Sequence, residues 1–168
     1  MGINDRHLLI KVANIHLSPN PSALKRELAQ TKPYYNRIKE TQVVNNIDKY
    51  WAQRYALFER FDEGIRLDDP SWARTPPGPV CEWIAGKCAQ ATLILDAFAG
   101  VGGTSIRIAS GPRCMKIIAN DWNGRRLQCL LNNAKVYDVD RCVELSESNF
   151  LQFELKGIEV VFAQPPID

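Results

Sequence analysis

The stretch that most constrains this chain is residues 92–104, which read TLILDAFAGVGGT. An apolar run leads into Asp96, and Gly100, Gly102 and Gly103 precede the helix-like sequence TSIRIAS. This order predicts a strand, a tight turn and a helix. Glycines after a parallel strand let the backbone approach a ligand closely, because they lack a Cβ atom and tolerate positive φ. The stretch therefore predicts a nucleotide-like ligand at the turn.

The spacing of the glycines favours S-adenosylmethionine over a dinucleotide. A GxGxxG turn brings a pyrophosphate onto a helix N-terminus, whereas this turn reads GxGG and follows Asp96. A carboxylate at that place repels phosphate and suits a ligand that has a positive ammonium group and no phosphate. S-adenosylmethionine is the common ligand of that kind. The alternative is a turn that binds nothing, since glycine-rich turns are frequent.

The sequence after residue 79 alternates between strand and helix patterns. We expect a helix over 80–90, strands over 116–120, 142–145 and 158–163, and a helix over 123–137. Such β-α-β alternation predicts an α/β fold with a parallel sheet. Groups that bind ligand should gather at the carboxyl ends of its strands.

The N-terminal part has a different character. Residues 1–46 are polar and basic, which predicts a loosely ordered segment and is compatible with a polyanion such as RNA. Aromatic residues then recur at helical spacing over 47–61, and prolines follow up to residue 79. We therefore expect three parts: the basic segment 1–46, a helical extension with a proline-rich bridge over 47–79, and a partial α/β domain over 80–168.

The sequence shows no pattern of a membrane span, a signal peptide or a metal site. No apolar run approaches the roughly 18–20 residues of a membrane span, and the N-terminus lacks the apolar core of a signal peptide. We therefore expect an intracellular protein with no membrane contact. The five cysteines and two histidines show no ligand spacing, so free thiols and no metal site are expected.

Two predicted strands end in residues that suit a nucleoside. Asp121 ends the second strand after the glycine turn, where a carboxylate can accept hydrogen bonds from both ribose hydroxyls. The alternative is a helix N-cap. Asn149 and Phe150 follow the next strand, where an amide and a ring could contact adenine. An ordinary loop asparagine is nearly as good an interpretation.

The last strand is followed by Gln164, Pro165 and Pro166. Prolines fix φ and hold the preceding residue extended, so this loop should be stiff. Its carbonyl groups and the Gln164 amide can accept hydrogen bonds from an exocyclic amine and turn that amine toward an electrophilic methyl group. A plain strand terminator is the alternative.

Several motifs together resemble one family, the trimethylguanosine synthases, which methylate N2 of 7-methylguanosine RNA caps. The resemblance spans about residues 47–166. The motifs that carry it are KYWAQRY (49–55), RFDEGI (60–65), DAFAGVGG (96–103), NNA (132–134) and VVFAQPP (160–166).

The resemblance implies a Rossmann-like class I methyltransferase fold with S-adenosylmethionine as the methyl donor. The partner it implies is a capped RNA of the small nuclear or nucleolar type, and the place it implies is the nucleus, in the nucleolus or Cajal body. It assigns roles to individual residues: the methionine end to Asp96, Gly100 and Gly102, the ribose to Asp121, adenine to Asn149 and Phe150, the donor to Thr75, cap phosphates to Lys49 and Arg54, and the acceptor amine to Gln164, Pro165 and Pro166.

Three positions depart from the family pattern. Gln164 stands where the family has serine, Ile167 stands where a tryptophan stacks on the cationic guanine, and Asn149 replaces an aspartate. The pattern also ends after a fourth strand, which predicts a truncated or divergent member with an exposed apolar sheet edge. The alternatives to cap methylation are an inactive donor-binding or RNA-interaction remnant and methylation of another exocyclic amine such as adenine N6.

Overall fold

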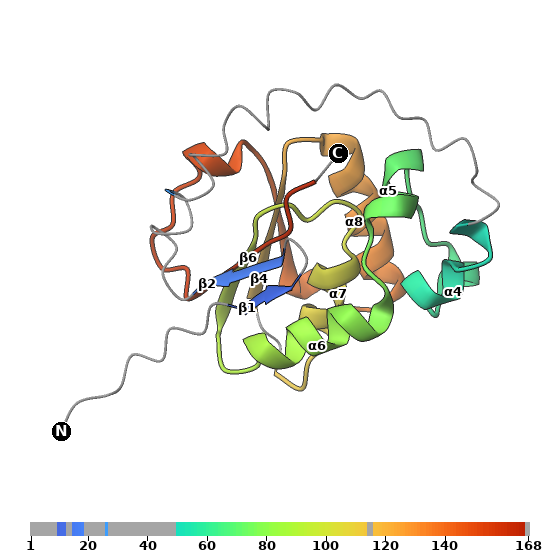
Figure 1. Ribbon diagram of the computed structural model, residues 1–168, viewed down its shortest axis with the longest axis horizontal. Coiled ribbons are helices and arrows are strands. Elements are labelled where there is room, and N and C mark those ends of the chain that lie inside the picture. The colour runs from blue at the N-terminus through green and yellow to red at the C-terminus, as the bar shows by residue number, and fades with distance from the viewer. Residues whose placement is uncertain (1–9, 13–14, 19–25, 27–49, 114–115, 167–168) are drawn as a thin grey trace.

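The computed structural model of the chain describes residues 10–12, 15–18, 26, 50–113 and 116–166. Six strands form one sheet in the order β1-β2-β6-β3-β4-β5 (Figure 1). The strands are β1 (Ile10–Val12), β2 (Ile15–Ser18), β3 (Leu93–Asp96), β4 (Lys116–Asp121), β5 (Val143–Glu147) and β6 (Val160–Ala163).

The four strands β6, β3, β4 and β5 are parallel. The chain runs outward from β3 to β4 and β5, and then returns to place β6 on the other side of β3. The strand order therefore reverses at β3. In open α/β sheets, ligands bind in the crevice at the carboxyl ends of the strands at such a reversal. The predicted α/β fold with a parallel sheet is confirmed.

The helices are α4 (Arg54–Leu57), α5 (Asp69–Arg74), α6 (Gly78–Cys88), α7 (Gly103–Ala109) and α8 (Gly124–Val136). Short 3-10 turns lie at Phe61–Glu63, Asp140–Cys142 and Phe150–Gln152. No helix in the described part of the chain is long and apolar enough to span a membrane.

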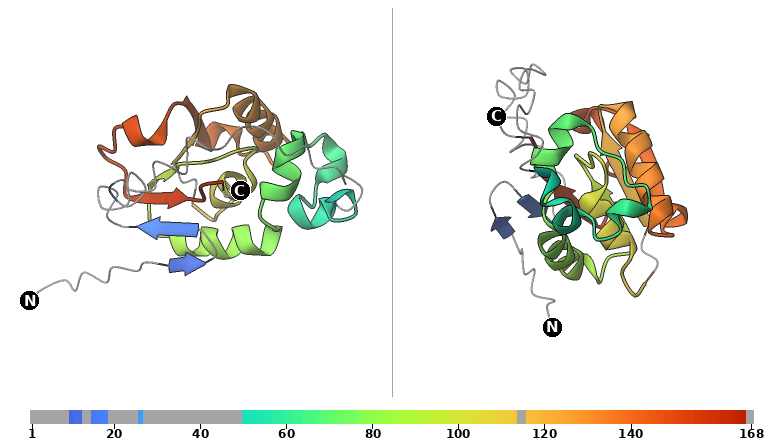
Figure 2. Two further views of the ribbon diagram at one scale, coloured as in Figure 1. Left: turned by 45° about the horizontal axis from the view of Figure 1, so that its top comes forward. Right: turned by 90° about the vertical axis from the view of Figure 1, so that its right-hand side faces the viewer.

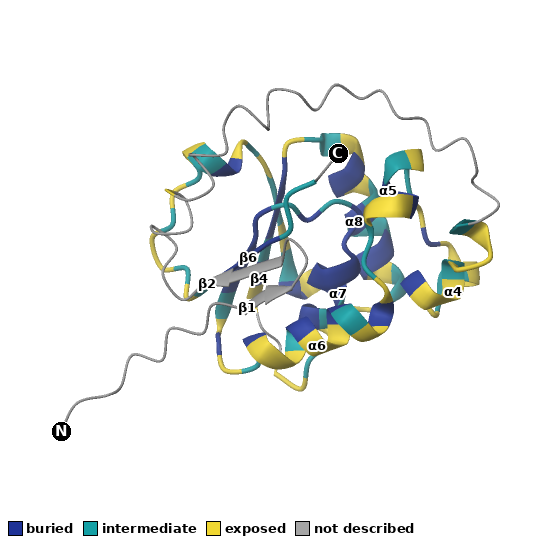
Figure 3. Ribbon diagram, in the orientation of Figure 1, coloured by how far each residue is buried: buried dark blue, intermediate teal, exposed yellow. Residues whose placement is uncertain are grey.

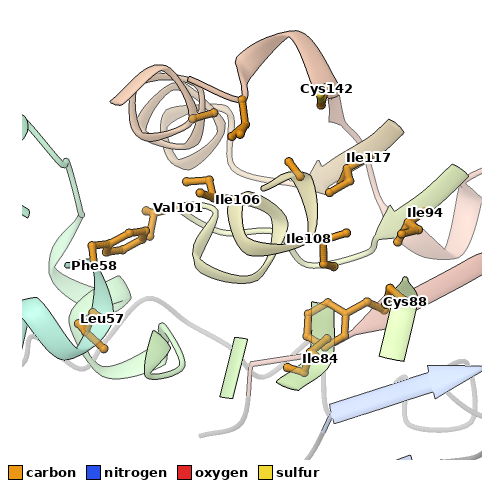
Figure 4. Packing of buried hydrophobic residues seen from close by; sticks show 14 of the residues in the cluster. Leu57, Phe58, Ile84, Cys88, Ile94, Val101, Ile106, Ile108, Ile117 and Cys142 are labelled. Carbon is orange, nitrogen blue, oxygen red and sulfur yellow. The ribbon is translucent and has the colours of Figure 1, made fainter. Parts of the chain in front are cut away.

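The main core lies between one face of the sheet and the helices. Ile108 of α7 lies on the side of Ile94 and Ile84, whereas Ile106 lies on the side of Val101 (Figure 4). All of them belong to one cluster with Ile117 of β4. Almost all of α7 is buried, whereas the outer sides of α4 and α6 are exposed (Figure 3). The period-two alternation of the strands supplies a second cluster on the opposite face, around Leu95, Val161 and Phe150.

The helix predicted over 47–61 is broken in the part that the structure describes. Residues 50–51 are helical, a turn follows, and α4 ends where Phe58 adopts an extended backbone with φ −140° and ψ 110°. This break lets Leu57 and Phe58 enter the main core while Trp51 and Phe61 pack against Trp72. Tertiary packing of the aromatic rings therefore overrides the helical pattern.

The proline-rich bridge also contains a helix that the sequence analysis missed. The side chain of Asp68 accepts a hydrogen bond from the backbone N–H of Ser71, so it caps the N-terminus of α5, and Pro70 lies in the first turn. Both are standard signals of a helix start. The helix predicted over 80–90 is present as α6 and begins at Gly78.

The sheet edge beside β6 is covered rather than exposed. Strand β2 pairs antiparallel with β6, with His16 opposite Ala163 and Ser18 opposite Val161. Figure 2 shows the two strands side by side and pointing in opposite directions. The exposed edge expected after the fourth strand was therefore wrong, because the N-terminal segment contributes a hairpin that the sequence analysis did not predict.

Candidate functional site

A cavity of about 250 Å³ lies at the carboxyl ends of β3, β4 and β6, where the strand order reverses. It is lined by residues from the glycine turn, from the two loops after β4 and β6, and from α5 and the segment that follows it. Among them are Ser71, Ala73, Arg74, Thr75, Pro76, Asp96, Phe98, Ala99, Gly100, Gly103, Thr104, Asp121, Trp122, Arg126, Gln164, Pro165 and Pro166. Predicted residues from distant parts of the sequence therefore meet in one place.

The glycine turn combines open space with tight packing. Gly100 lines the cavity with φ +53°, and a Cβ atom there would meet no atom within 4 Å. Gly102 has φ +95° and a different task, because a Cβ atom on it would lie 2.7 Å from Cγ of Leu130 in α8. Gly100 therefore leaves room for a ligand, while Gly102 lets the turn pack on α8.

Asp96 forms the buried acidic floor of the cavity. Its side chain is 1% exposed, and burial raises its pKa to about 7. The hydroxyl of Ser105 donates a 2.6 Å hydrogen bond to Oδ2, and the N–H of Phe98 donates a longer one of 3.4 Å to Oδ1. The site therefore holds a carboxyl group that gains charge readily once a positive ligand arrives.

Asp121 ties the end of β4 to the glycine turn. Its Oδ2 accepts a 2.9 Å hydrogen bond from the N–H of Gly100, and its Oδ1 accepts one of the same length from the N–H of Asn123. Burial raises its pKa above the ordinary value. The N-cap of α8 is Asn123, whose side chain accepts from Arg125 and Arg126, so Asp121 is not the cap.

The loop Gln164-Pro165-Pro166 faces the same cavity from the end of β6. The N–H of Ala97 donates a 2.8 Å hydrogen bond to the carbonyl of Phe162, which joins the ends of β3 and β6. The Gln-Pro-Pro loop and the glycine turn therefore flank one crevice, as the sequence pattern predicted.

The N-terminal extension forms one wall of the cavity, next to the start of α7. Thr75 lines it and packs so closely on Gly103 that a Cβ atom there would lie 2.8 Å from Cγ2 of Thr75. Fully buried Asn133 of α8 accepts from the N–H of Arg66 and donates to the carbonyls of Arg66 and Val101. One side chain thus fastens the extension to the glycine turn.

Four predicted site residues lie away from the cavity. Gly102 belongs to the glycine turn but packs against α8, as described above. Exposed Asn149 caps a 3-10 turn by accepting from the N–H of Leu151, and Phe150 is buried against Phe98, with ring centroids 5.7 Å apart. Phe98 itself lines the cavity, so Phe150 supports its wall.

Arg54 is the fourth of these residues. Its guanidinium lies over the rings of Trp51 and Tyr55, at 4.8 Å and 4.2 Å from their centroids. The other predicted phosphate contact, Lys49, lies outside the described residues, and so does Ile167.

Several cavity residues were missed by the sequence analysis. Trp122 is 55% exposed at the rim, and its position directly after the strand-end acid Asp121 was the available signal. Arg74 and Arg126 come from helices whose approach to the crevice is set by tertiary packing, so no local pattern marks them. No cluster of three or more potential metal ligands occurs among the residues with described positions.

Comparison with known families agrees with this geometry. Residues 91–168 match the family described as RNA cap guanine-N2 methyltransferase. This part of the chain, just under half of its length, is therefore similar to that family. The resemblance to trimethylguanosine synthases that the sequence motifs indicated is thereby confirmed.

Two curated yeast proteins are similar to the chain over part of their length. It is 33% identical over 130 residues to trimethylguanosine synthase of Schizosaccharomyces pombe, which covers 71% of this chain and 53% of that protein. It is 28% identical over 143 residues to the Saccharomyces cerevisiae protein of the same name, covering 77% and 45%. The chain therefore spans about half the length of these curated relatives.

Solved methyltransferase structures overlap the fold in part. An RNA methyltransferase from Salinibacter ruber in complex with S-adenosyl-L-homocysteine is 18% identical, with 49% of this chain and 55% of that chain covered and a TM-score of 0.45. A putative O-methyltransferase from Klebsiella pneumoniae is 20% identical, with 78% and 52% covered and a TM-score of 0.45. The fold assignment rests on the strand order described above and on the family match.

Proposed function

We propose that this chain carries the donor site and part of the acceptor site of an S-adenosylmethionine-dependent methyltransferase that acts on N2 of the guanine in 7-methylguanosine RNA caps. The observation that carries the proposal is that the glycine turn with buried Asp96 and the loop Gln164-Pro165-Pro166 line one cavity at the strand-order reversal. The match of residues 91–168 to the family described as RNA cap guanine-N2 methyltransferase supports the same reaction.

The cavity fits S-adenosylmethionine on chemical grounds. Asp96 offers a buried carboxyl group for a positive ligand, and Gly100 leaves space where the backbone must come close. Asp121 keeps free lone pairs on both carboxylate oxygens for ribose hydroxyls, since each oxygen accepts one backbone N–H. Exposed Trp122 offers a ring face beside that position, and Thr75 closes the other side.

The chemistry of the acceptor side follows from the Gln-Pro-Pro loop. Bound S-adenosylmethionine would supply an electrophilic methyl group on a sulfonium. The guanine N2 lone pair is delocalised, so catalysis depends on holding the amine within about 3–3.5 Å of that methyl and in line with it. The amide oxygen of Gln164 and the carbonyl of Pro165 accept hydrogen bonds from the amine, which orients it and stabilises the positive charge that nitrogen gains.

The remaining assigned residues stay part of the proposal. Arg54 and Lys49 would contact the cap phosphates from the extension. Asn149 and Phe150 would border adenine, with Phe150 acting through the wall residue Phe98. The substrate would be the cap of a small nuclear or nucleolar RNA. The protein would work in the nucleus, in the nucleolus or Cajal body. Imaging of the tagged protein beside nucleolar and Cajal-body markers would test this location.

Two measurements on the same chain test the function. Calorimetry should detect S-adenosylmethionine binding, and the variant Asp96→Asn should weaken it because the positive ligand loses its buried carboxylate. A methyl-transfer assay should then show transfer to a 7-methylguanosine cap dinucleotide and none to an unmethylated cap or to adenine-containing DNA.

The alternative function is donor binding without transfer. The observation that favours it is Gln164, which replaces the serine expected from the family pattern. Binding without transfer to any acceptor would support that alternative, and transfer to the DNA alone would indicate an adenine N6 methyltransferase. Absence of donor binding would refute the proposed function altogether.

A further inference from the structure

The walls of the cavity carry charges of both signs. Asp96 and Asp121 lie at the ends of β3 and β4, while the side chains of Arg74 and Arg126 lie among the other lining residues. The acidic side suits the positive and hydroxyl-bearing parts of a nucleoside ligand. The basic side has no task in the donor contacts proposed above.

Arg126 is the better defined of the two arginines. It lies in the first turn of α8 and is 8% exposed. Its Nε donates a 2.8 Å hydrogen bond to Oδ2 of Asp68, and the two side chains form an ion pair. Asp68 in turn caps α5 through its Oδ1, which accepts from the N–H and the hydroxyl of Ser71. The guanidinium is therefore held in place by a carboxylate that is itself fixed.

In this arrangement most of the N–H donors of the Arg126 guanidinium make no hydrogen bond within the described part of the chain. An arginine has five N–H donors in a planar fork. Among the residues that the structure describes, Asp68 is the hydrogen-bond partner of Nε, and the two terminal nitrogens of Arg126 have none. Neither terminal nitrogen is buried away from solvent without a partner. Since the residue lines the cavity, these four remaining donors are available to a ligand there.

We propose that Arg126 is a binding residue that recognises an oxyanion of a ligand in this cavity. A buried guanidinium with free, preorganised donors pairs best with a carboxylate or phosphate, and the helix N-terminus beside it favours negative charge as well. The inference rests on the proposed function, which offers two sources of such a group: the carboxylate of the methyl donor and the phosphates of the cap.

A purely structural role is the competing explanation. Arg126 also links α8 to α5 through Asp68, so its loss could weaken any ligand by disturbing the cavity wall. The two explanations differ in what they predict for ligands that lack the anion. Loss of anion recognition affects only the charged ligand, whereas a disturbed wall affects both ligands alike.

The experiment compares affinities within two ligand pairs by calorimetry on the full chain. The first pair is S-adenosylmethionine and its decarboxylated analogue, and the second is 7-methylguanosine triphosphate and the 7-methylguanosine nucleoside. The variant is Arg126→Gln. Its matched control is Arg125→Gln, which removes the same charge from an exposed neighbour that does not line the cavity.

We expect Arg126→Gln to lower the affinity ratio of one pair by roughly tenfold to a hundredfold, as the loss of a hydrogen-bonded charge contact does. Arg125→Gln should leave both ratios within about twofold. A fall in the first pair assigns the donor carboxylate, and a fall in the second assigns the cap phosphates. Equal weakening of both members of each pair, or ratios that match the control, would overturn the proposal.

Two further results keep the test decisive. If Arg126→Gln does not fold, Arg126→Lys takes its place, and its ratio should fall by a smaller factor of about three to ten because a point charge replaces the fork. An unchanged ratio in the lysine variant would again overturn the proposal. If the unaltered chain binds neither S-adenosylmethionine nor the cap triphosphate, the proposed function fails, which is distinct from a failure of Arg126 to discriminate.

Discussion

The change Asn133→Ala should destabilise the fold more than any ordinary substitution of a polar helix residue. Asn133 is fully buried, and its amide accepts from the N–H of Arg66 at 2.7 Å and donates to the carbonyls of Arg66 and Val101 at 2.9 and 3.0 Å. Alanine leaves all three backbone groups without this partner. Because Val101 belongs to the glycine turn, the loss also loosens the donor side of the cavity.

The magnitude follows from these contacts. A hydrogen bond contributes about 1 kcal/mol net, and a buried group left unpaired costs about 1–3 kcal/mol. Three groups therefore give at least about 3 kcal/mol, and the exposed surroundings of Arg66, where water can replace part of the loss, keep the total near this lower bound. The free energy of unfolding of a small domain is about 5–15 kcal/mol, so the variant should still fold.

Urea unfolding followed by tryptophan fluorescence measures the difference in the free energy of unfolding. The matched control is Asn132→Ala on the same helix. Its half-buried side chain donates a 2.8 Å hydrogen bond to the carbonyl of Gly64 and a longer one of 3.2 Å to Oδ1 of Asn133, and its loss leaves the three backbone contacts of Asn133 in place. It should cost about 1 kcal/mol. A cost below about 1 kcal/mol for Asn133→Ala, or one no larger than that of the control, would refute the view that this amide fastens the extension to the turn.

Three further outcomes are expected. Gly102→Ala should destabilise the chain by about 2–4 kcal/mol in urea unfolding, because a φ of +95° disfavours a side chain and Leu130 fills the space. The control, Gly86→Ala on the exposed side of α6, should stabilise the chain by about 0.5–1 kcal/mol. Burial raises the pKa of Asp96 from an ordinary value near 4 to about 7, so the free energy of unfolding should fall as the pH rises from about 4 to 7. The variant Asp96→Asn should show a smaller difference between unfolding curves taken at pH 5 and pH 8. Deletion of residues 1–18 should expose the edge of β6 and cause association that grows with concentration in light scattering. A deletion variant that associates no more than the full chain would contradict this.

The sequence was most informative where local patterns match local structure. Strands β3, β4 and β6, helix α8 and the turn around Gly100 were predicted because their periodicity and glycines specify them directly. The meeting of Asp96 and Gln164 at one crevice could also be predicted, since carboxyl ends of parallel strands share one edge of a sheet.

Other features depend on contacts between distant segments. Arg126 lines the cavity because Asp68, far away in the sequence, holds its guanidinium, and the strength of that pairing is invisible in either local sequence. The helix predicted over 47–61 is interrupted at Phe58, because burial of this ring in the main core stabilises the chain more than a continued helix would. Strand β2 was missed because a four-residue piece of mixed polarity acquires its structure only from its partner strands.

The pairing of β2 with β6 has a consequence for how the chain acquires its shape during synthesis. Ser18 lies opposite Val161, so the partner of this early segment is made about 140 residues later. At about 5–20 residues per second the ribosome needs roughly 7–30 s to reach it, far longer than helices and hairpins take to form. The strands β3, β4 and β5 can assemble in that interval, while the hairpin of β1 and β2 waits for its partner β6. The hairpin leaves the ribosome long before β6 and is still among the last segments to join the sheet, so a chaperone that holds it in that interval would act on the order of assembly rather than on the final fold.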